Sequence, residues 1–110
     1  MEQFNHYHSF VNSMKMYPPS QAVIYPTLGL TGEAGEIAEK VKKWIRDEDG
    51  ETISEERRNA ILLELGDPLW YITALAGDLG YTLQDVVDAN VNKLTSRKER
   101  GTLQGSGDNR

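Results

Sequence analysis

Apolar residues recur at the spacing of an α-helix through most of this sequence, and that pattern restricts the fold more than any other feature. One set follows the i, i+3, i+4, i+7, i+11 pattern of a buried helical stripe: Ala34, Ile37, Ala38, Val41 and Ile45. No segment shows the alternation of apolar and polar residues that is typical of a half-buried strand. The sequence therefore predicts an all-α fold.

Proline, glycine and capping residues divide the chain into four predicted helices. Pro18-Pro19 ends the first helix and Asp49-Gly50 ends the second. Ser54 and Thr82 stand where capping residues open the third and fourth helices. Pro68 lies inside the third helix, where it removes a hydrogen bond and should bend the axis. The predicted helices cover about residues 2–17, 28–49, 54–80 and 82–97.

Length and composition limit the class of protein. The chain has 110 residues, no cysteine and a formal net charge of -5. We expect one helical domain over residues 1–100 and a flexible polar tail over residues 101–110. No signal peptide pattern or membrane-length apolar run is present, so we expect a cytoplasmic protein with no membrane partner. Net negative charge disfavours direct nucleic-acid binding, although divalent cations can still join an acidic protein to a nucleotide.

Four acidic residues form two pairs with the same spacing. Glu33 and Glu36 project from one face of the second predicted helix, and Glu64 and Asp67 repeat this arrangement on the third. Each pair lies beside its apolar stripe, so antiparallel packing of the two helices could bring all four carboxylates to one seam. Close carboxylates repel one another, and Mg²⁺ or Mn²⁺ would remove that conflict because both prefer oxygen ligands.

Glycines accompany these acids. Gly32, Gly35 and Gly66 lie inside the predicted helices, where glycine costs about 1 kcal/mol relative to alanine. Close approach of a neighbouring helix or a ligand would explain that cost. The alternative is that the acids are solvated side chains on amphipathic helices, as most Glu and Asp residues are. The residues alone do not decide between these two interpretations.

The acidic pairs also carry a resemblance to a known family. Glu33-Ala34-Gly35-Glu36 and Glu64-Leu65-Gly66-Asp67 match E-x-x-E and E-x-x-D motifs on successive helices. With their surroundings, over about residues 25–100, they resemble the MazG-like, all-α nucleoside triphosphate pyrophosphohydrolase family. The resemblance implies a four-helix bundle that assembles into a dimer or tetramer, with the nucleotide near a subunit boundary. The C-terminal residues from Arg97 onward are similar to compact bacteriophage members.

The resemblance also implies roles for particular residues. Mg²⁺, with Mn²⁺ able to substitute, would be bound by the four acids Glu33, Glu36, Glu64 and Asp67. We take Glu33 or Glu36 as the candidate catalytic base that accepts a proton from the attacking water. Some relatives carry a further acid where this chain has Gly32, which leaves the identity of the base open.

Asn90, Lys93 and Arg97 match family positions that are implicated in contacts with the nucleotide and its phosphates. They are therefore the candidate nucleotide-binding residues of the fourth predicted helix.

Basic and aromatic residues near the acids are further candidates. Lys40 and Lys43 follow the first acidic pair on the same side of the helix and could bind the outgoing pyrophosphate. Lys40 also stands four residues after Glu36, the spacing of an ordinary surface ion pair. Tyr71 projects close to the direction of the second acidic pair and is a candidate for nucleotide contact, whereas we expect Trp70 in the core.

The resemblance thus implies an Mg²⁺-dependent enzyme that converts a (d)NTP to the (d)NMP and pyrophosphate. Phage-type resemblance gives a slight preference for a purine deoxynucleotide, with guanine as the base. Two alternatives stay open: phosphoribosyl-ATP pyrophosphohydrolase, and a non-catalytic helical oligomerisation module that binds metal or nucleotide.

Overall fold

A computed structural model describes residues 2–107 and contains four α-helices and no strand within that range. The elements are α1 (Glu2–Met14), a short 3-10 helix η1 (Pro19–Gln21), α2 (Ile24–Asp47), α3 (Glu55–Asp78) and α4 (Leu83–Glu99). The predicted all-α class is confirmed. The last part of the predicted tail, residues 108–110, lies outside the described residues.

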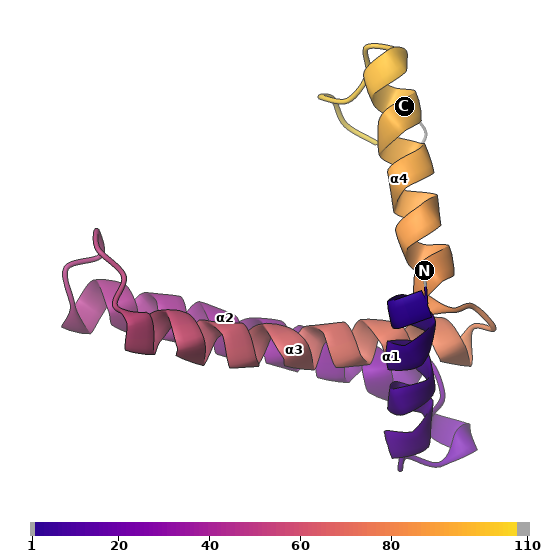
Figure 1. The fold of residues 1–110 in the computed structure, drawn as a ribbon, viewed down its shortest axis with the longest axis horizontal. Helices are drawn as coiled ribbons and strands as arrows, with labels where there is room; N and C mark the ends of the chain where they lie inside the picture. Colours follow the sequence, from indigo (N-terminus) through magenta and orange to yellow (C-terminus); the bar gives the residue numbers. More distant parts are fainter. Residues whose placement is uncertain (1, 108–110) are drawn as a thin grey trace.

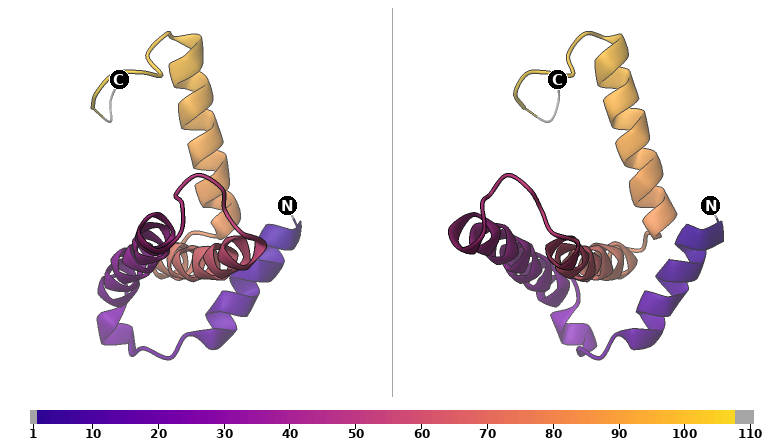
Figure 2. Two further views of the ribbon diagram at one scale, coloured as in Figure 1. Left: turned by 90° about the vertical axis from the view of Figure 1, so that its left-hand side faces the viewer. Right: turned by 60° about the vertical axis from the view of Figure 1, so that its left-hand side comes forward.

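The two long helices α2 and α3 run side by side as an antiparallel hairpin (Figure 1). Helix α1 crosses α3 at one end of this hairpin, and α4 projects away from that same end (Figure 2). The radius of gyration is 17.0 Å, against about 13 Å for a compact domain of 100 residues. The four expected helices are present, but among the described residues of one chain only α2 and α3 pack along their lengths.

The core is small and lies where α1, α3 and α4 meet. Its buried apolar side chains are Val11, Ala74, Ala76 and Leu83. The apolar stripe predicted to be buried on the second helix is not buried throughout, because Ile45 is 63% exposed, and on the facing helix α3 Leu65 is 51% exposed. That part of the prediction is wrong for the single chain, because no other element of residues 2–107 covers these side chains.

The predicted capping residues start the helices as expected. Ser54 accepts a hydrogen bond from the Arg57 backbone N–H at 3.1 Å at the start of α3. Thr82 and Asp85 form a reciprocal capping box at the start of α4. After α3, Gly80 has a φ of 87°, a conformation that favours glycine, and the chain turns there into α4.

Pro26 was predicted to lie in a linker, but it lies inside α2. Pro26 lies in the first turn of α2, whose N–H groups need no partner within the helix, so α2 begins at Ile24 rather than near residue 28. Pro68 lies inside α3, which continues on both sides of it. The first helix ends at Met14, three residues earlier than expected.

None of the helices in residues 2–107 combines the length and apolar character that a membrane crossing needs.

Candidate metal centre

The antiparallel hairpin brings three of the four predicted acids together. Glu33 of α2 and Glu64 and Asp67 of α3 each offer one carboxylate oxygen, and these oxygens lie within 4.8 Å of one another. Mg²⁺ holds its oxygen ligands at about 2.0–2.1 Å, so small side-chain rotations would bring the three oxygens to one ion. A set of carboxylates that is partly open to solvent suits Mg²⁺ or Mn²⁺, which keep waters that a phosphate can replace.

The electrostatics of Glu33 reflect this crowding. Partial burial raises its pKa, and the negative charges of Asp67, Glu36 and Glu64 raise it further. A bound divalent cation would favour the ionised carboxylate and oppose these effects. Glu36 is exposed one turn further along α2, and its carboxylate is not part of the group of three. It is still close enough for its charge to act on Glu33.

The two candidate lysines differ in position. Lys40 reaches across the hairpin to Glu64, with 4.0 Å between its Nζ and the Oε1 of Glu64. It therefore lies beside the acidic group. Lys43 lies close enough to Glu39 and Asp47 on its own helix to interact with their charges. The structure thus places Lys40, rather than Lys43, next to the three carboxylates.

Two aromatic residues stand beside the acids. A cavity of about 300 Å³ is lined by Glu33, Asp67, Trp70 and Tyr71. The predicted position of Tyr71 next to the acids is thus observed, and burial followed by the charges of Tyr25, Glu33 and Asp67 raises its pKa. Trp70 was expected in the core, and this was wrong. The buried positions of α3 come one turn later, which leaves Trp70 at the edge of the site.

A second cavity of about 570 Å³ shares Trp70 and Tyr71 with the first. Its other lining side chains come from the end of α1, the following segment and the start of α2: Met14, Met16, Tyr17, Pro18, Gln21 and Tyr25. Of the side chains that line this cavity, only Tyr71 was a candidate for nucleotide contact from the sequence. No motif marks the lining residues outside α3, because they meet the site only through the crossing of α1 over α3.

The glycines beside the acids are not in close contact with a neighbouring helix. A Cβ at Gly32, Gly35 or Gly66 would meet no atom within 4 Å among the described residues, other than its own neighbours and helix backbone. Close approach of a neighbouring helix therefore does not explain these three glycines within one chain, and a ligand stays the remaining suggestion. Gly29 is the crowded position, because a Cβ there would lie 2.3 Å from the Tyr71 ring.

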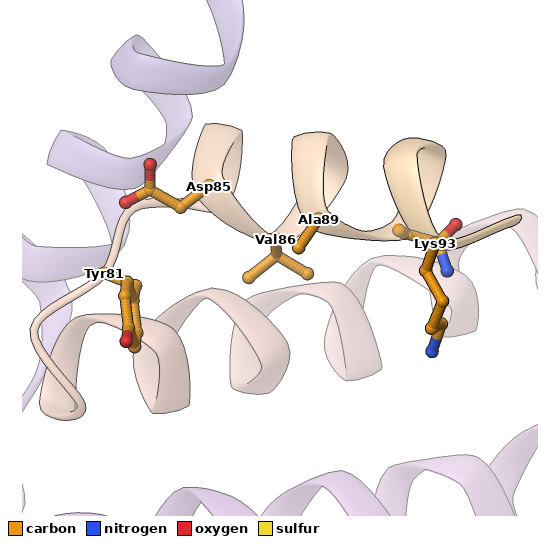
Figure 3. A pocket seen from close by; sticks show the side chains of 6 residues that line it. Tyr81, Asp85, Val86, Ala89 and Lys93 are labelled. Atoms are coloured by element: carbon orange, nitrogen blue, oxygen red, sulfur yellow. The ribbon is translucent and has the colours of Figure 1, made fainter. Parts of the chain in front are cut away.

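The candidates on α4 lie apart from the acids. Asn90 and Lys93 line a separate cavity of about 610 Å³, together with Tyr81, Val86 and their neighbours (Figure 3). Arg97 is only 6% exposed. Because α4 projects away from the hairpin (Figure 1), one chain does not bring these residues to the three carboxylates.

The geometry defines a class of protein: an all-α chain in which two antiparallel helices present a carboxylate group suited to a divalent cation. Residues 24–102 match the MazG nucleotide pyrophosphohydrolase domain, and the chain belongs to this family. The expected family is therefore confirmed. The matched range includes both acidic pairs and all of α4.

Two relatives extend this comparison. The chain is 54% identical over 90 residues to the Gene 37 protein of Mycobacterium phage L5, covering 82% of this chain and 78% of the phage protein. It is 35% identical over 74 residues to the protein YvdC of Bacillus subtilis (strain 168), covering 64% of this chain and 70% of that protein. No solved structure is significantly similar to the chain.

Proposed function

We propose that this chain hydrolyses nucleoside triphosphates to the monophosphate and pyrophosphate, with Mg²⁺ at the three clustered acids and Mn²⁺ able to replace it. The observation that carries this proposal is the group Glu33, Glu64 and Asp67, whose carboxylate oxygens lie within 4.8 Å of one another in a chain of the MazG family. We propose Glu36 as a fourth ligand that joins the group when the cation and nucleotide are bound.

The chain's own residues have separate tasks in this proposal. Bound Mg²⁺ would neutralise phosphate charge and hold the phosphates for an in-line displacement. Glu33 or Glu36 accepts a proton from water, the oxygen of that water bonds to phosphorus, and the bridging bond between the α- and β-phosphates breaks. Lys40, which already lies beside Glu64, binds the departing pyrophosphate as a positive point charge.

We further propose that the working enzyme is a homo-oligomer, a dimer or a tetramer. Exposed apolar side chains on α3, among them Leu62, Leu63 and Leu65, support this proposal because such patches are typical of protein contacts. In an assembly, Asn90 and Lys93 of α4 would reach the phosphates at the acidic group of another copy, and we propose that Arg97, which is nearly buried within one chain, turns outward to join them.

The substrate is proposed to be a deoxynucleotide, with a purine such as dGTP favoured, and the place of action is the cytoplasm. Similarity to a phage protein agrees with the phage-type resemblance on which this preference rests. The protein would act on free nucleotides rather than on nucleic acid, consistent with its net charge of -5.

A substrate panel tests this proposal directly. The purified protein is mixed with each common ribo- and deoxyribonucleoside triphosphate, and with phosphoribosyl-ATP, in the presence of Mg²⁺, Mn²⁺ or a chelator. We expect monophosphate and pyrophosphate in equal amounts, only with a divalent cation, and fastest with a purine deoxynucleotide. Turnover of phosphoribosyl-ATP alone would favour that narrower activity. Turnover of no substrate would contradict the proposal and favour a binding module.

A further inference from the structure

Asp78, at the C-terminal end of α3, forms hydrogen bonds with the segment between α1 and α2. Its carboxylate accepts hydrogen bonds from Lys15 Nζ at 2.9 Å, from the Tyr17 hydroxyl at 2.8 Å and from the Val23 backbone N–H at 2.9 Å. The Asp78 side chain is only 8% exposed. One nearly buried carboxylate thus holds three points of a segment that lies more than fifty residues away in sequence.

The conformation at Val23 shows that this attachment is specific. Val23 has a φ of 70° and a ψ of -50°, and Ile24 N–H donates to the Ala22 carbonyl at 2.8 Å across it. A β-branched residue rarely adopts a positive φ, and a tight turn of this kind is strained. Such a conformation persists only where surrounding contacts hold it. The hydrogen bond from Val23 to Asp78 is one of those contacts.

The segment held by Asp78 forms one wall of the larger cavity described above. The Tyr17 ring stacks on the Tyr25 ring at 4.8 Å between centroids, and Tyr25 contacts Tyr71 at 6.5 Å. Tyr71 also lines the smaller cavity with Glu33. A row of three rings therefore leads from Asp78 to the acidic group. The larger cavity, of about 570 Å³, falls within the range of roughly 300–1,000 Å³ that is usual for small-molecule sites.

We propose that Asp78 is a positioning residue: it fixes the wall that carries Tyr17 and Tyr25, and this wall binds the base of the nucleotide. The inference rests on the proposed function, because it assumes that the phosphates occupy the acidic group. Asp78 touches neither the phosphates nor the three clustered acids. Its loss should therefore weaken nucleotide binding and leave the rate of the bound complex nearly unchanged.

The decisive variant is Asp78→Asn, which replaces the carboxylate by a neutral group of the same size. We expect KM to rise about tenfold, which corresponds to about 1.4 kcal/mol of binding free energy. We expect kcat to stay within about threefold, because an interaction lost equally from ground state and transition state changes KM alone. Tyr17→Phe keeps the stacked ring and removes one hydrogen bond to Asp78. It should give a smaller rise, of about threefold.

The matched control is Asp47→Asn, which removes an exposed ion pair with Arg46 at the opposite end of the hairpin (Figure 1). It should change neither kinetic constant. Binding is measured in parallel by calorimetry with Mg²⁺ and the α,β-methylene analogues of dGTP and dTTP, which cannot be cleaved at that bond. Circular dichroism checks that each variant keeps its helices.

The outcomes separate this inference from the proposed function. A rise in KM and in Kd for Asp78→Asn and Tyr17→Phe, at nearly constant kcat, supports it. Unchanged constants in both variants, or a fall in kcat at unchanged KM, overturns it. If Asp78→Asn does not fold, Tyr17→Phe decides by the same criterion. A wild-type protein that binds an analogue but hydrolyses no triphosphate contradicts the proposed function, and the Kd ratios still decide this inference. A wild type that binds neither analogue overturns both.

Discussion

Adding one methyl group at Gly29 should disturb the aromatic side of the site. A Cβ at this position of α2 would lie 2.3, 2.5 and 2.6 Å from three atoms of the Tyr71 ring. Carbon atoms in contact need about 3.5–4.0 Å, so the ring would have to withdraw by about 1 Å or more. Gly32, one turn later on the same helix, has no such neighbour within 4 Å. Gly29→Ala and Gly32→Ala therefore form a matched pair.

The expected magnitudes follow from two opposing effects. Replacing a glycine inside a helix by alanine stabilises the fold by about 1 kcal/mol. Overpacking against a neighbouring side chain costs about 1–3 kcal/mol. Gly32→Ala should show only the gain, whereas Gly29→Ala should range from neutral to a loss of about 2 kcal/mol. For a chain of this size, about 4 °C of Tm per kcal/mol puts the two variants about 4–12 °C apart.

Thermal unfolding by far-UV circular dichroism measures this difference, and near-UV circular dichroism reports on the Tyr71 environment. We expect a changed near-UV spectrum for Gly29→Ala only. If Gly29→Ala melted at or above the Tm of Gly32→Ala with an unchanged spectrum, the packing of Tyr71 against α2 would be refuted.

Three further predictions concern single contacts. Thr82→Ala removes the capping box of α4 and should lower the free energy of unfolding by about 1 kcal/mol in urea titrations, and an unchanged midpoint would count against the cap. Val23→Gly should relieve backbone strain of about 1–3 kcal/mol, whereas the extra entropy of glycine in the unfolded chain costs about 1 kcal/mol. The urea midpoint of this variant should therefore stay the same or rise, and a clear drop would show that Val23 is not strained. For Asp78, burial alone would raise the pKa, but hydrogen bonds from Val23, Lys15 and Tyr17 outweigh it and lower the pKa. The stability that ionised Asp78 contributes is therefore fully present above its ordinary pKa of 3.8, and it is lost as the pH falls through the lowered pKa. The stability difference between wild type and Asp78→Asn should shrink over that window, and a constant difference would refute the assignment.

Much of the site could be predicted because it depends on local spacing. Glu64 and Asp67 share a helix face by periodicity, and the capping residues Ser54 and Thr82 set where α3 and α4 begin. Antiparallel pairing of two amphipathic helices then brings Glu33 to the opposite side of the same seam. These features need only the geometry of a helix and one packing rule.

The remaining features depend on contacts between distant residues or on chain direction. Asp78 and Tyr17 are 61 residues apart, and neither belongs to a motif. Trp70 could equally have faced the core or the site, since its place depends on where α1 crosses α3. The direction of α4 depends on the turn at Gly80, which separates Lys93 from the acids within one chain. Apolar periodicity indicated which face of α3 is apolar, but not that Leu65 would remain exposed in the single chain.

A calorimetric titration with Mn²⁺ measures whether the clustered carboxylates bind a metal ion. The double variant Glu64→Gln with Asp67→Asn removes two of the three clustered ligands, whereas Glu39→Gln removes an exposed acid paired with Lys42. Mutation of a residue that only hydrogen-bonds to a metal ligand lowers metal affinity by about 10–100-fold. Loss of two of the ligands themselves should therefore lower Mn²⁺ affinity by more than that. We predict that the double variant loses nearly all Mn²⁺ binding and that Glu39→Gln binds Mn²⁺ as tightly as the wild type. Equal Mn²⁺ affinity in the wild type and both variants would mean that the clustered carboxylates do not form the metal site.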